Sequence, residues 1–186
     1  MTLFLVVYDE SMRRVLAAAV VIVGVAGAGL LNAQTSEAPV FPNLAFLSVD
    51  GTQRIDLESL RGRPVLLTFW ASWCGPCRME LPELAKLVGE LKSEDLALVT
   101  VNMDRTPAQG MQFLQRYGID IPVYLMSRND LATLGVESLP TSVLIDRQGR
   151  PVQIYEGYSP TVPEEIRRLV VGMEGGPSPS AASSVK

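Results

Sequence analysis

Apolar runs alternate with amphipathic stretches along the central part of the chain. Pro64–Trp70 and Leu96–Asn102 are almost continuously apolar, as expected of strands buried on both faces of a sheet. Between them, apolar residues recur every three or four positions over Gly75–Leu91, which predicts an amphipathic helix. Pro107–Tyr117 begins with proline and precedes Gly118, the usual start and stop of a helix. This alternation predicts a partly parallel sheet covered by helices.

Shorter elements complete the pattern. Asp50-Gly51 is a strong hairpin-turn signal between expected strands at Leu44–Val49 and Gln53–Ile55. A Gly-containing turn joins two later strands, Ser142–Asp146 and Val152–Tyr155, which predicts an antiparallel edge. The remaining predicted elements are helical turns at Asp56–Leu60 and Asn129–Leu134, an extended segment at Val123–Met126 and a final helix at Pro163–Gly172.

The N-terminal part contains an uncharged apolar run, Val15–Leu31, which follows Arg13 and Arg14. Its length is close to the roughly 20 residues of a membrane span, and preceding arginines mark the cytoplasmic side. It is either an uncleaved anchor or a signal peptide cut at small residues such as Ala26-Gly27-Ala28; a helix of the globular core is the remaining alternative. The apolar and acidic start, Thr2–Ser11, lacks a basic region and suggests that Met12 begins the natural chain.

The chain therefore divides into four parts. Residues 1–33 are the signal peptide or anchor, and residues 34–42 form a polar, proline-containing linker. Residues 43–173 form one domain, which either form of the N-terminal segment would place outside the cytoplasm. Residues 174–186 include the low-complexity run GGPSPSAASSVK, which cannot bury apolar surface and is expected to be disordered.

Composition narrows the possible chemistry. The 186 residues include no histidine, which excludes Ser-His-Asp and Cys-His catalytic sets and His-ligated metal sites. The two cysteines allow at most one intramolecular disulfide and exclude a four-cysteine zinc site within one chain. The formal net charge of −4 argues against nucleic acid as a partner, because nucleic-acid binding needs a basic face.

Both cysteines lie in Trp73-Cys74-Gly75-Pro76-Cys77, directly after a predicted buried strand. Cys74 would lie at the start of the following helix, where free N–H groups and the helix dipole favour a thiolate. Pro76 suits the first helical turn, and the two-residue spacer brings Cys77 within bonding reach. Cys74 could then attack a substrate disulfide and Cys77 resolve the mixed disulfide. A metal half-site and a static structural disulfide are the alternatives.

The sequence around the cysteines resembles the thioredoxin superfamily. Thr68–Pro82 is similar to the membrane-tethered, extracytoplasmic TlpA/ResA-like thioredoxins. Gly135-Val136, Leu139-Pro140-Thr141 and Leu144–Gly149 match the second hallmark of that family, and the resemblance covers about Pro39 to Gly172. It implies an α/β thioredoxin fold, with a central mixed sheet flanked by helices and an added N-terminal β-hairpin. A single N-terminal hydrophobic helix would precede this fold.

The resemblance also implies roles for individual residues. Pro140 matches the family's cis-proline beside the active-site disulfide, where the backbone of the preceding Leu139 pairs with a substrate strand. Glu80, three residues after Cys77, matches a glutamate that exchanges a proton with the buried thiol. Ordinary thioredoxins carry a buried aspartate where this chain has Thr68, so proton handling falls to Glu80.

Residues around Cys74 are expected to contact substrate. Trp73, Gly75 and Pro76 form this group, whereas Trp70 is expected to belong to the core. No metal ligand and no cofactor is expected. The segment Thr106–Pro122 is similar to the extra elements that the family adds to the thioredoxin core.

Three functions follow from these features. The first is an extracytoplasmic thiol–disulfide oxidoreductase, a reductant because its Gly-Pro spacer resembles that of reducing thioredoxins. The resemblance implies exported proteins as substrates, notably the haem-attachment thiols of apocytochrome c, and a membrane thiol-transfer protein as electron donor. The second is a peroxidase, although the Pro-x-x-x-Thr-x-x-Cys pattern of peroxiredoxins is missing before Cys74. The third is a copper(I)-delivery module using Cys74, Cys77 and Met103, although related copper proteins usually add a histidine.

Overall fold

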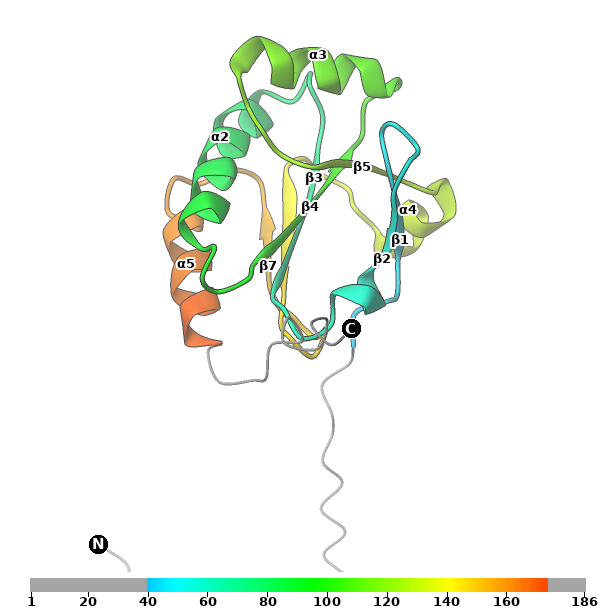
Figure 1. Ribbon diagram of the computed structural model, residues 1–186. Coiled ribbons are helices and arrows are strands. Elements are labelled where there is room, and N and C mark those ends of the chain that lie inside the picture. The colour runs from blue at the N-terminus through cyan, green and yellow to red at the C-terminus, as the bar shows by residue number, and fades with distance from the viewer. Residues whose placement is uncertain (1–39, 174–186) are drawn as a thin grey trace, which may run out of the picture. The chain divides into compact units, whose positions relative to one another are not determined.

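The computed structural model describes residues 40–173 (Figure 1). The predicted signal peptide or anchor at 1–33, the start at Met12, most of the linker and the tail at 174–186 lie outside the described residues. None of the helices between residues 40 and 173 is both long enough and apolar enough to span a membrane.

Residues 40–173 contain seven strands in one mixed sheet. They are β1 (Ala45–Ser48), β2 (Arg54–Asp56), β3 (Val65–Trp70), β4 (Ala97–Asn102), β5 (Val123–Met126), β6 (Thr141–Ile145) and β7 (Pro151–Glu156). Their spatial order is β2-β1-β5-β4-β3-β6-β7. The central strands β3, β4 and β5 pair in parallel, and the outer pairs are antiparallel. The predicted mixed α/β sheet with an antiparallel edge is confirmed.

Side chains along β3 point alternately to the two faces of the sheet, and the core accordingly has two layers. Leu66 and Trp70 pack into the cluster that contains the apolar side chains of the helix after β3, whereas Leu67 and Phe69 pack into the cluster on the opposite face. Successive strand residues point to opposite faces, so one strand serves both layers. Every residue of β3 is buried, which explains its almost unbroken apolar sequence.

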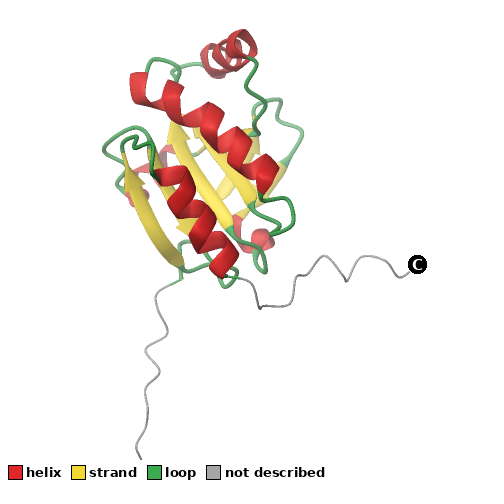
Figure 2. Ribbon diagram, turned by 90° about the vertical axis from the view of Figure 1, so that its left-hand side faces the viewer, coloured by secondary structure: helices red, strands yellow, loops and turns green. Residues whose placement is uncertain are grey.

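Helices cover both faces of the sheet. The helical elements are the short 3-10 helix η1 (Leu57–Leu60) and the α-helices α2 (Gly75–Glu90), α3 (Pro107–Tyr117), α4 (Arg128–Leu134) and α5 (Val162–Gly172). Apolar residues of α2, α3 and α5 belong to one core cluster, and those of η1 and α4 belong to the other. Figure 2 shows α2 and α5 side by side across the same face. The observed ends of the elements differ from the predicted ones by at most one residue, and both ends of α3 and β5 match.

β1 and β2 pair antiparallel around the predicted turn, with Phe46 opposite Ile55. The connection is longer than a two-residue hairpin turn, and hydrogen bonds to the side chain of Asp50 hold it together. The Asp50 carboxylate accepts hydrogen bonds from the Ser48 hydroxyl and from the backbone N–H of Thr52. Gly51 adopts a positive φ of 72°, a conformation in which glycine is favoured.

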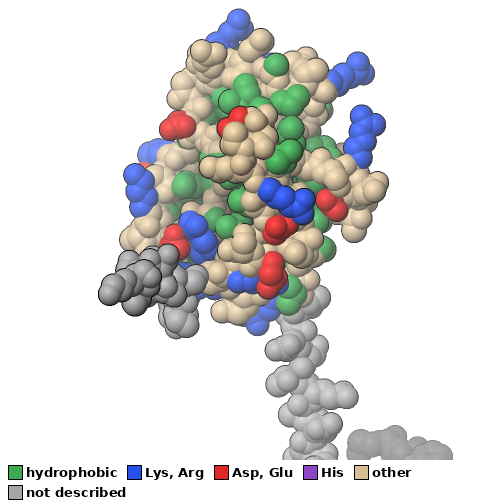
Figure 3. Space-filling view, turned by 45° about the vertical axis from the view of Figure 1, so that its right-hand side comes forward, with side chains coloured by type: hydrophobic (Ala, Val, Ile, Leu, Met, Phe, Trp, Pro, Cys, Tyr) green, Lys and Arg blue, Asp and Glu red, His purple; other side chains and the backbone are tan. Residues whose placement is uncertain are grey.

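Charged side chains are interspersed on the face that Figure 3 shows, where acidic and basic groups alternate around exposed hydrophobic side chains. Several basic side chains of residues 40–173 form ion pairs with acidic ones. Arg63 lies 2.9 Å from Asp95 and Arg150 lies 2.8 Å from Asp146. The face that Figure 3 shows therefore carries no continuous basic surface.

Polar groups at the end of β4 form a close contact with α3. The Asn102 side-chain amide donates a 2.8 Å hydrogen bond to the carboxylate of Asp104. Gly110 of α3 lies against this pair, and an added Cβ there would come within 2.4 Å of Asn102 Nδ2. The absence of a side chain at Gly110 therefore allows α3 to pack against the end of β4.

We expect Gly110→Ala to lower the free energy of unfolding by about 1–3 kcal/mol, because the new methyl group overpacks this contact. Gly89→Ala is a matched control, since Gly89 is also helical but an added Cβ would meet nothing within 4 Å. That control should stabilise the protein by about 0.5–1 kcal/mol through helix propensity alone. Denaturant unfolding compares the two variants, and a stabilising effect of both would contradict the close packing at Gly110.

Candidate active site

The two cysteines form a disulfide at the start of α2, with an S–S distance of 2.07 Å. Cys74 is the N-cap residue of the helix, and the backbone N–H of Cys77 donates a 3.1 Å hydrogen bond to its sulfur. Cys77 is fully buried, whereas Cys74 retains a small exposed surface. The helix N-terminus and the donated N–H both favour negative charge on the Cys74 sulfur once the disulfide is reduced.

The loop before Cys74 is held by hydrogen bonds from both sides. The Asp104 carboxylate accepts bonds from the Ser72 hydroxyl at 2.9 Å and from the Ser72 N–H at 3.1 Å. Arg78 Nε donates a 2.9 Å bond to the Ser72 carbonyl. All the polar groups of Ser72 are therefore paired, which fixes the path of the chain from β3 to Cys74.

Strand register brings Pro140 to the end of the sheet where the Cys74 loop lies. Phe69 near the end of β3 pairs with Thr141 at the start of β6, so Pro140 lies beside the point where the Cys74 loop leaves β3. The Leu139–Pro140 peptide bond is cis, as the resemblance implied. Pro140 is buried and its carbonyl accepts a 2.8 Å bond from the Gly157 N–H.

Glu80 is a buried carboxyl, with only 1% of its surface exposed. Its Oε1 accepts a 3.3 Å hydrogen bond from the Ser142 hydroxyl, whereas Oε2 has no partner among the described residues. Burial raises the pKa of Glu80 to about 7; the nearby Glu83 charge raises it too, and the Ser142 bond partly offsets them. Glu80 therefore exists as both acid and carboxylate near neutral pH, as a proton acceptor for a thiol requires.

Ser142 belongs to this site and was not among the residues expected from the sequence. Its hydroxyl lies 2.9 Å from the Thr68 hydroxyl, so Thr68, Ser142 and Glu80 form one buried polar chain across β3, β6 and α2. The available signal was the occurrence of hydroxyl residues in two otherwise apolar strands. Because the register pairs Thr68 with Ser142, both hydroxyls point toward α2.

The residues expected to contact substrate surround Cys74 on its solvent side. Trp73 is 65% exposed, and Gly75 and Pro76 are exposed in the first turn of α2. Trp70 is fully buried in the core, as predicted. The structure therefore brings Cys74, Cys77 and Pro140 to one end of the sheet, with Glu80 one helical turn beyond Cys77. The substrate-contacting roles remain predictions.

Comparison with known proteins agrees with this geometry. The family model described as Redoxin matches residues 34–168, well over half of the chain. The chain belongs to the Redoxin family. Two thiol-disulfide oxidoreductases named ResA are similar to this Redoxin family member. The one from Bacillus subtilis is 35% identical over 123 residues, which cover 66% of this chain and 68% of that protein. The one from Halalkalibacterium halodurans is 32% identical over 120 residues, which cover 63% and 68%.

A solved structure from Chlorobium tepidum, assigned as a thiol:disulfide interchange protein DsbE, is similar in fold. Its TM-score is 0.66 with 30% sequence identity, over 74% of this chain and 97% of that one. The predicted relationship to TlpA/ResA-like proteins of the thioredoxin superfamily is confirmed, and so are the thioredoxin-like fold and the assignment as a thiol–disulfide oxidoreductase.

The raised pKa of Glu80 should make the stability of this Redoxin family member depend on pH. The pKa is raised on folding, from an ordinary value of 4.5 to about 7, so the neutral form favours the folded state. That stabilisation is complete below about pH 4.5 and is lost as the pH rises through 7. Glu80→Gln keeps the neutral shape and should raise the free energy of unfolding at pH 8 by about 2–3 kcal/mol.

Denaturant unfolding of the oxidised proteins at pH 5 and pH 8 measures this difference, which should shrink at pH 5. Glu156→Gln is the control, because Glu156 is an exposed residue of the edge strand β7. A stability difference for Glu80→Gln that is equal at both pH values would show that Glu80 does not titrate between them.

Proposed function

We propose that this oxidoreductase is an extracytoplasmic reductant of disulfides in exported proteins, including the haem-attachment disulfide of apocytochrome c. The observation that carries the proposal is the buried carboxyl of Glu80, one helical turn from Cys77 on α2. A static disulfide needs no proton acceptor beside it, whereas a dithiol that opens and closes does. In a chain without histidine, a carboxyl with a pKa of about 7 supplies one.

Cys74 is the attacking residue in the proposed reaction. In the reduced protein its thiolate is stabilised by the Cys77 N–H and by the start of α2. It attacks one sulfur of the substrate disulfide, the substrate S–S bond breaks, and the second substrate sulfur leaves as a thiolate that takes a proton. The product of this step is a mixed disulfide between Cys74 and the substrate.

Cys77 completes the exchange. Glu80 as the carboxylate accepts the Cys77 proton, and the resulting thiolate attacks the Cys74 sulfur. The mixed disulfide breaks, and the substrate leaves as its second free thiol. The protein dithiol is thereby oxidised to the disulfide seen in the structure, and the substrate disulfide is reduced to two thiols. Two electrons move from protein to substrate in each cycle.

The backbone of Leu139 supports a docking mode for the substrate. Within residues 40–173, neither its N–H nor its carbonyl makes a hydrogen bond. An extended substrate segment can therefore pair with the Leu139 backbone beside the cis-proline through main-chain hydrogen bonds. The exposed indole of Trp73 supplies an apolar contact on the other side of Cys74.

The proposed location and partners rest on the N-terminal sequence and on the resemblance. Val15–Leu31 is apolar and follows two arginines, a pattern typical of a segment that directs the following domain across the membrane. A reductant outside the cytoplasm needs electrons from inside. We therefore propose a membrane thiol-transfer protein as the donor that reduces the Cys74–Cys77 disulfide after each cycle.

The reduction potential tests the direction of the reaction. We expect a value below about −200 mV, closer to thioredoxin at about −270 mV than to the oxidant DsbA at about −120 mV. Equilibration with glutathione or dithiothreitol buffers, followed by thiol alkylation, measures it. A potential above about −180 mV, the range of protein disulfide isomerase, would exclude a reductant.

Trapping tests the substrate. In Cys77→Ser, Cys74 can still attack but nothing resolves the adduct, so mixed disulfides should accumulate in cells. Mass spectrometry of the captured complexes should identify exported proteins, apocytochrome c among them. Cys74→Ser lacks the attacking sulfur and should capture none of these partners. Capture confined to cytoplasmic proteins would contradict the proposed location, and a set without c-type cytochromes would contradict that substrate.

A further inference from the structure

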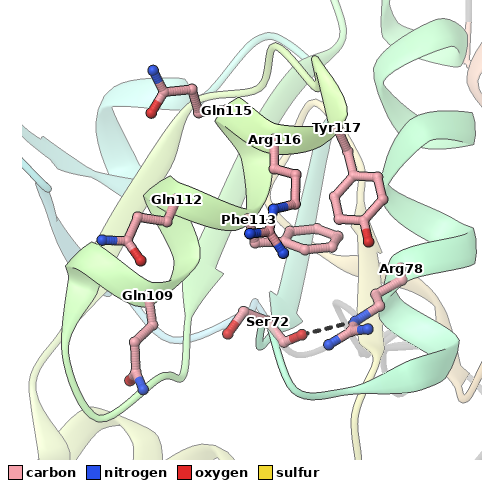
Figure 4. A pocket seen from close by; sticks show the side chains of 8 residues that line it. All are labelled: Ser72, Arg78, Gln109, Gln112, Phe113, Gln115, Arg116 and Tyr117. Atoms are coloured by element: carbon pink, nitrogen blue, oxygen red, sulfur yellow. Dashed lines mark hydrogen bonds between the residues drawn. The ribbon is translucent and has the colours of Figure 1, made fainter.

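A cavity of about 610 Å³ opens between the start of α2 and one face of α3 (Figure 4). Ser72 and Arg78 border it on the redox side, and residues of α3 form the opposite wall. Ser72 lies two residues before Cys74, and Arg78 directly follows Cys77. The cavity therefore begins at the loop that presents the attacking cysteine.

Arg78 is held in a defined orientation at the edge of the cavity. Its Nε donates to the Ser72 carbonyl at 2.9 Å, and its guanidinium carbon lies 5.6 Å from the centre of the Phe113 ring. These contacts fix the plane of the guanidinium and leave its terminal NH2 groups available. Arg78 makes no salt bridge with any residue between 40 and 173.

The wall formed by α3 is also polar and cationic. Gln109, Gln112, Phe113 and Arg116 recur at helical spacing, so they share one face, and all four line the cavity. Arg116, like Arg78, has no acidic partner within the described part of the chain. Among residues 40–173 no carboxylate lines the cavity, although acidic residues outnumber basic ones in the whole chain.

We propose that this cavity binds an acidic side chain of the protein substrate, next to the disulfide that Cys74 attacks. Two guanidinium groups that have no carboxylate partner within the described part of the chain match a carboxylate in charge and in hydrogen-bond geometry. The amides of Gln109 and Gln112 supply further donors along the same wall. The inference rests on the proposed reductase activity and adds a preference for substrates with Asp or Glu near the disulfide.

The test uses two synthetic peptides with the same intramolecular disulfide, one flanked by glutamates and the other by glutamines. The reduced full-length protein reacts with each peptide at low ionic strength, and the second-order rate constants give an acidic-to-neutral ratio. The wild-type ratio should be about fivefold and should fall with added salt, because exposed ion pairs are modest in strength and are screened. In Arg78→Gln/Arg116→Gln the ratio should approach one.

A ratio cancels any general change in thiol reactivity caused by loss of the Arg78–Ser72 hydrogen bond. Arg128→Gln is the control, because Arg128 is an exposed arginine of α4 outside this cavity, and it should keep the wild-type ratio. Equal rates for both peptides with the wild type would overturn the docking inference and leave the reductase intact. A preference that survives in the double variant would also overturn it. Failure to reduce either peptide would instead contradict the proposed function.

Discussion

The pairing of β3 on both sides determines where the functional groups meet. Its register places Trp70 beside Asn102 and Phe69 beside Thr141, so the Cys74 loop, Asp104 and Pro140 emerge at one end of the sheet. A slip of one residue would turn Thr68 to the opposite face and remove it from the polar chain that reaches Glu80. Because both layers of the core pack on β3, such a slip would also exchange side chains of different size between the two layers, and the resulting misfit protects the register.

The proposed proton transfer by Glu80 depends on burial of its carboxyl rather than on an intrinsically suitable side chain. Histidine titrates near neutrality in water, whereas glutamate does so only when its charged form is disfavoured. Burial against the core around α2 raises the Glu80 pKa to about 7. The hydrogen bond from Ser142 favours the carboxylate and so limits this rise. Glu80 Oε2 has no hydrogen-bond partner within residues 40–173, as the proposed exchange of a proton with a second group requires.

The sequence predicted the elements that repeat a simple pattern. The buried strands, the helix that begins after Cys74 and the cis-proline followed from apolar runs, caps and a recognisable motif. Ser142 and Asp104 could not be predicted in the same way, because their roles arise from strand pairing between distant segments. Arg116 on α3 has the spacing of an ordinary solvated helix face, and only the packing of α3 beside α2 shows which groups it faces.

The hydrogen bonds around Ser72 have a thermodynamic consequence for catalysis. Its N–H, hydroxyl and carbonyl are all bonded to Asp104 or Arg78, so the loop loses its conformational freedom when the chain folds and not when a substrate arrives. When a substrate disulfide binds, the loop therefore loses little further conformational entropy, so the site is preorganised. Two side chains from outside the redox motif thus help to determine how readily the first sulfur is presented.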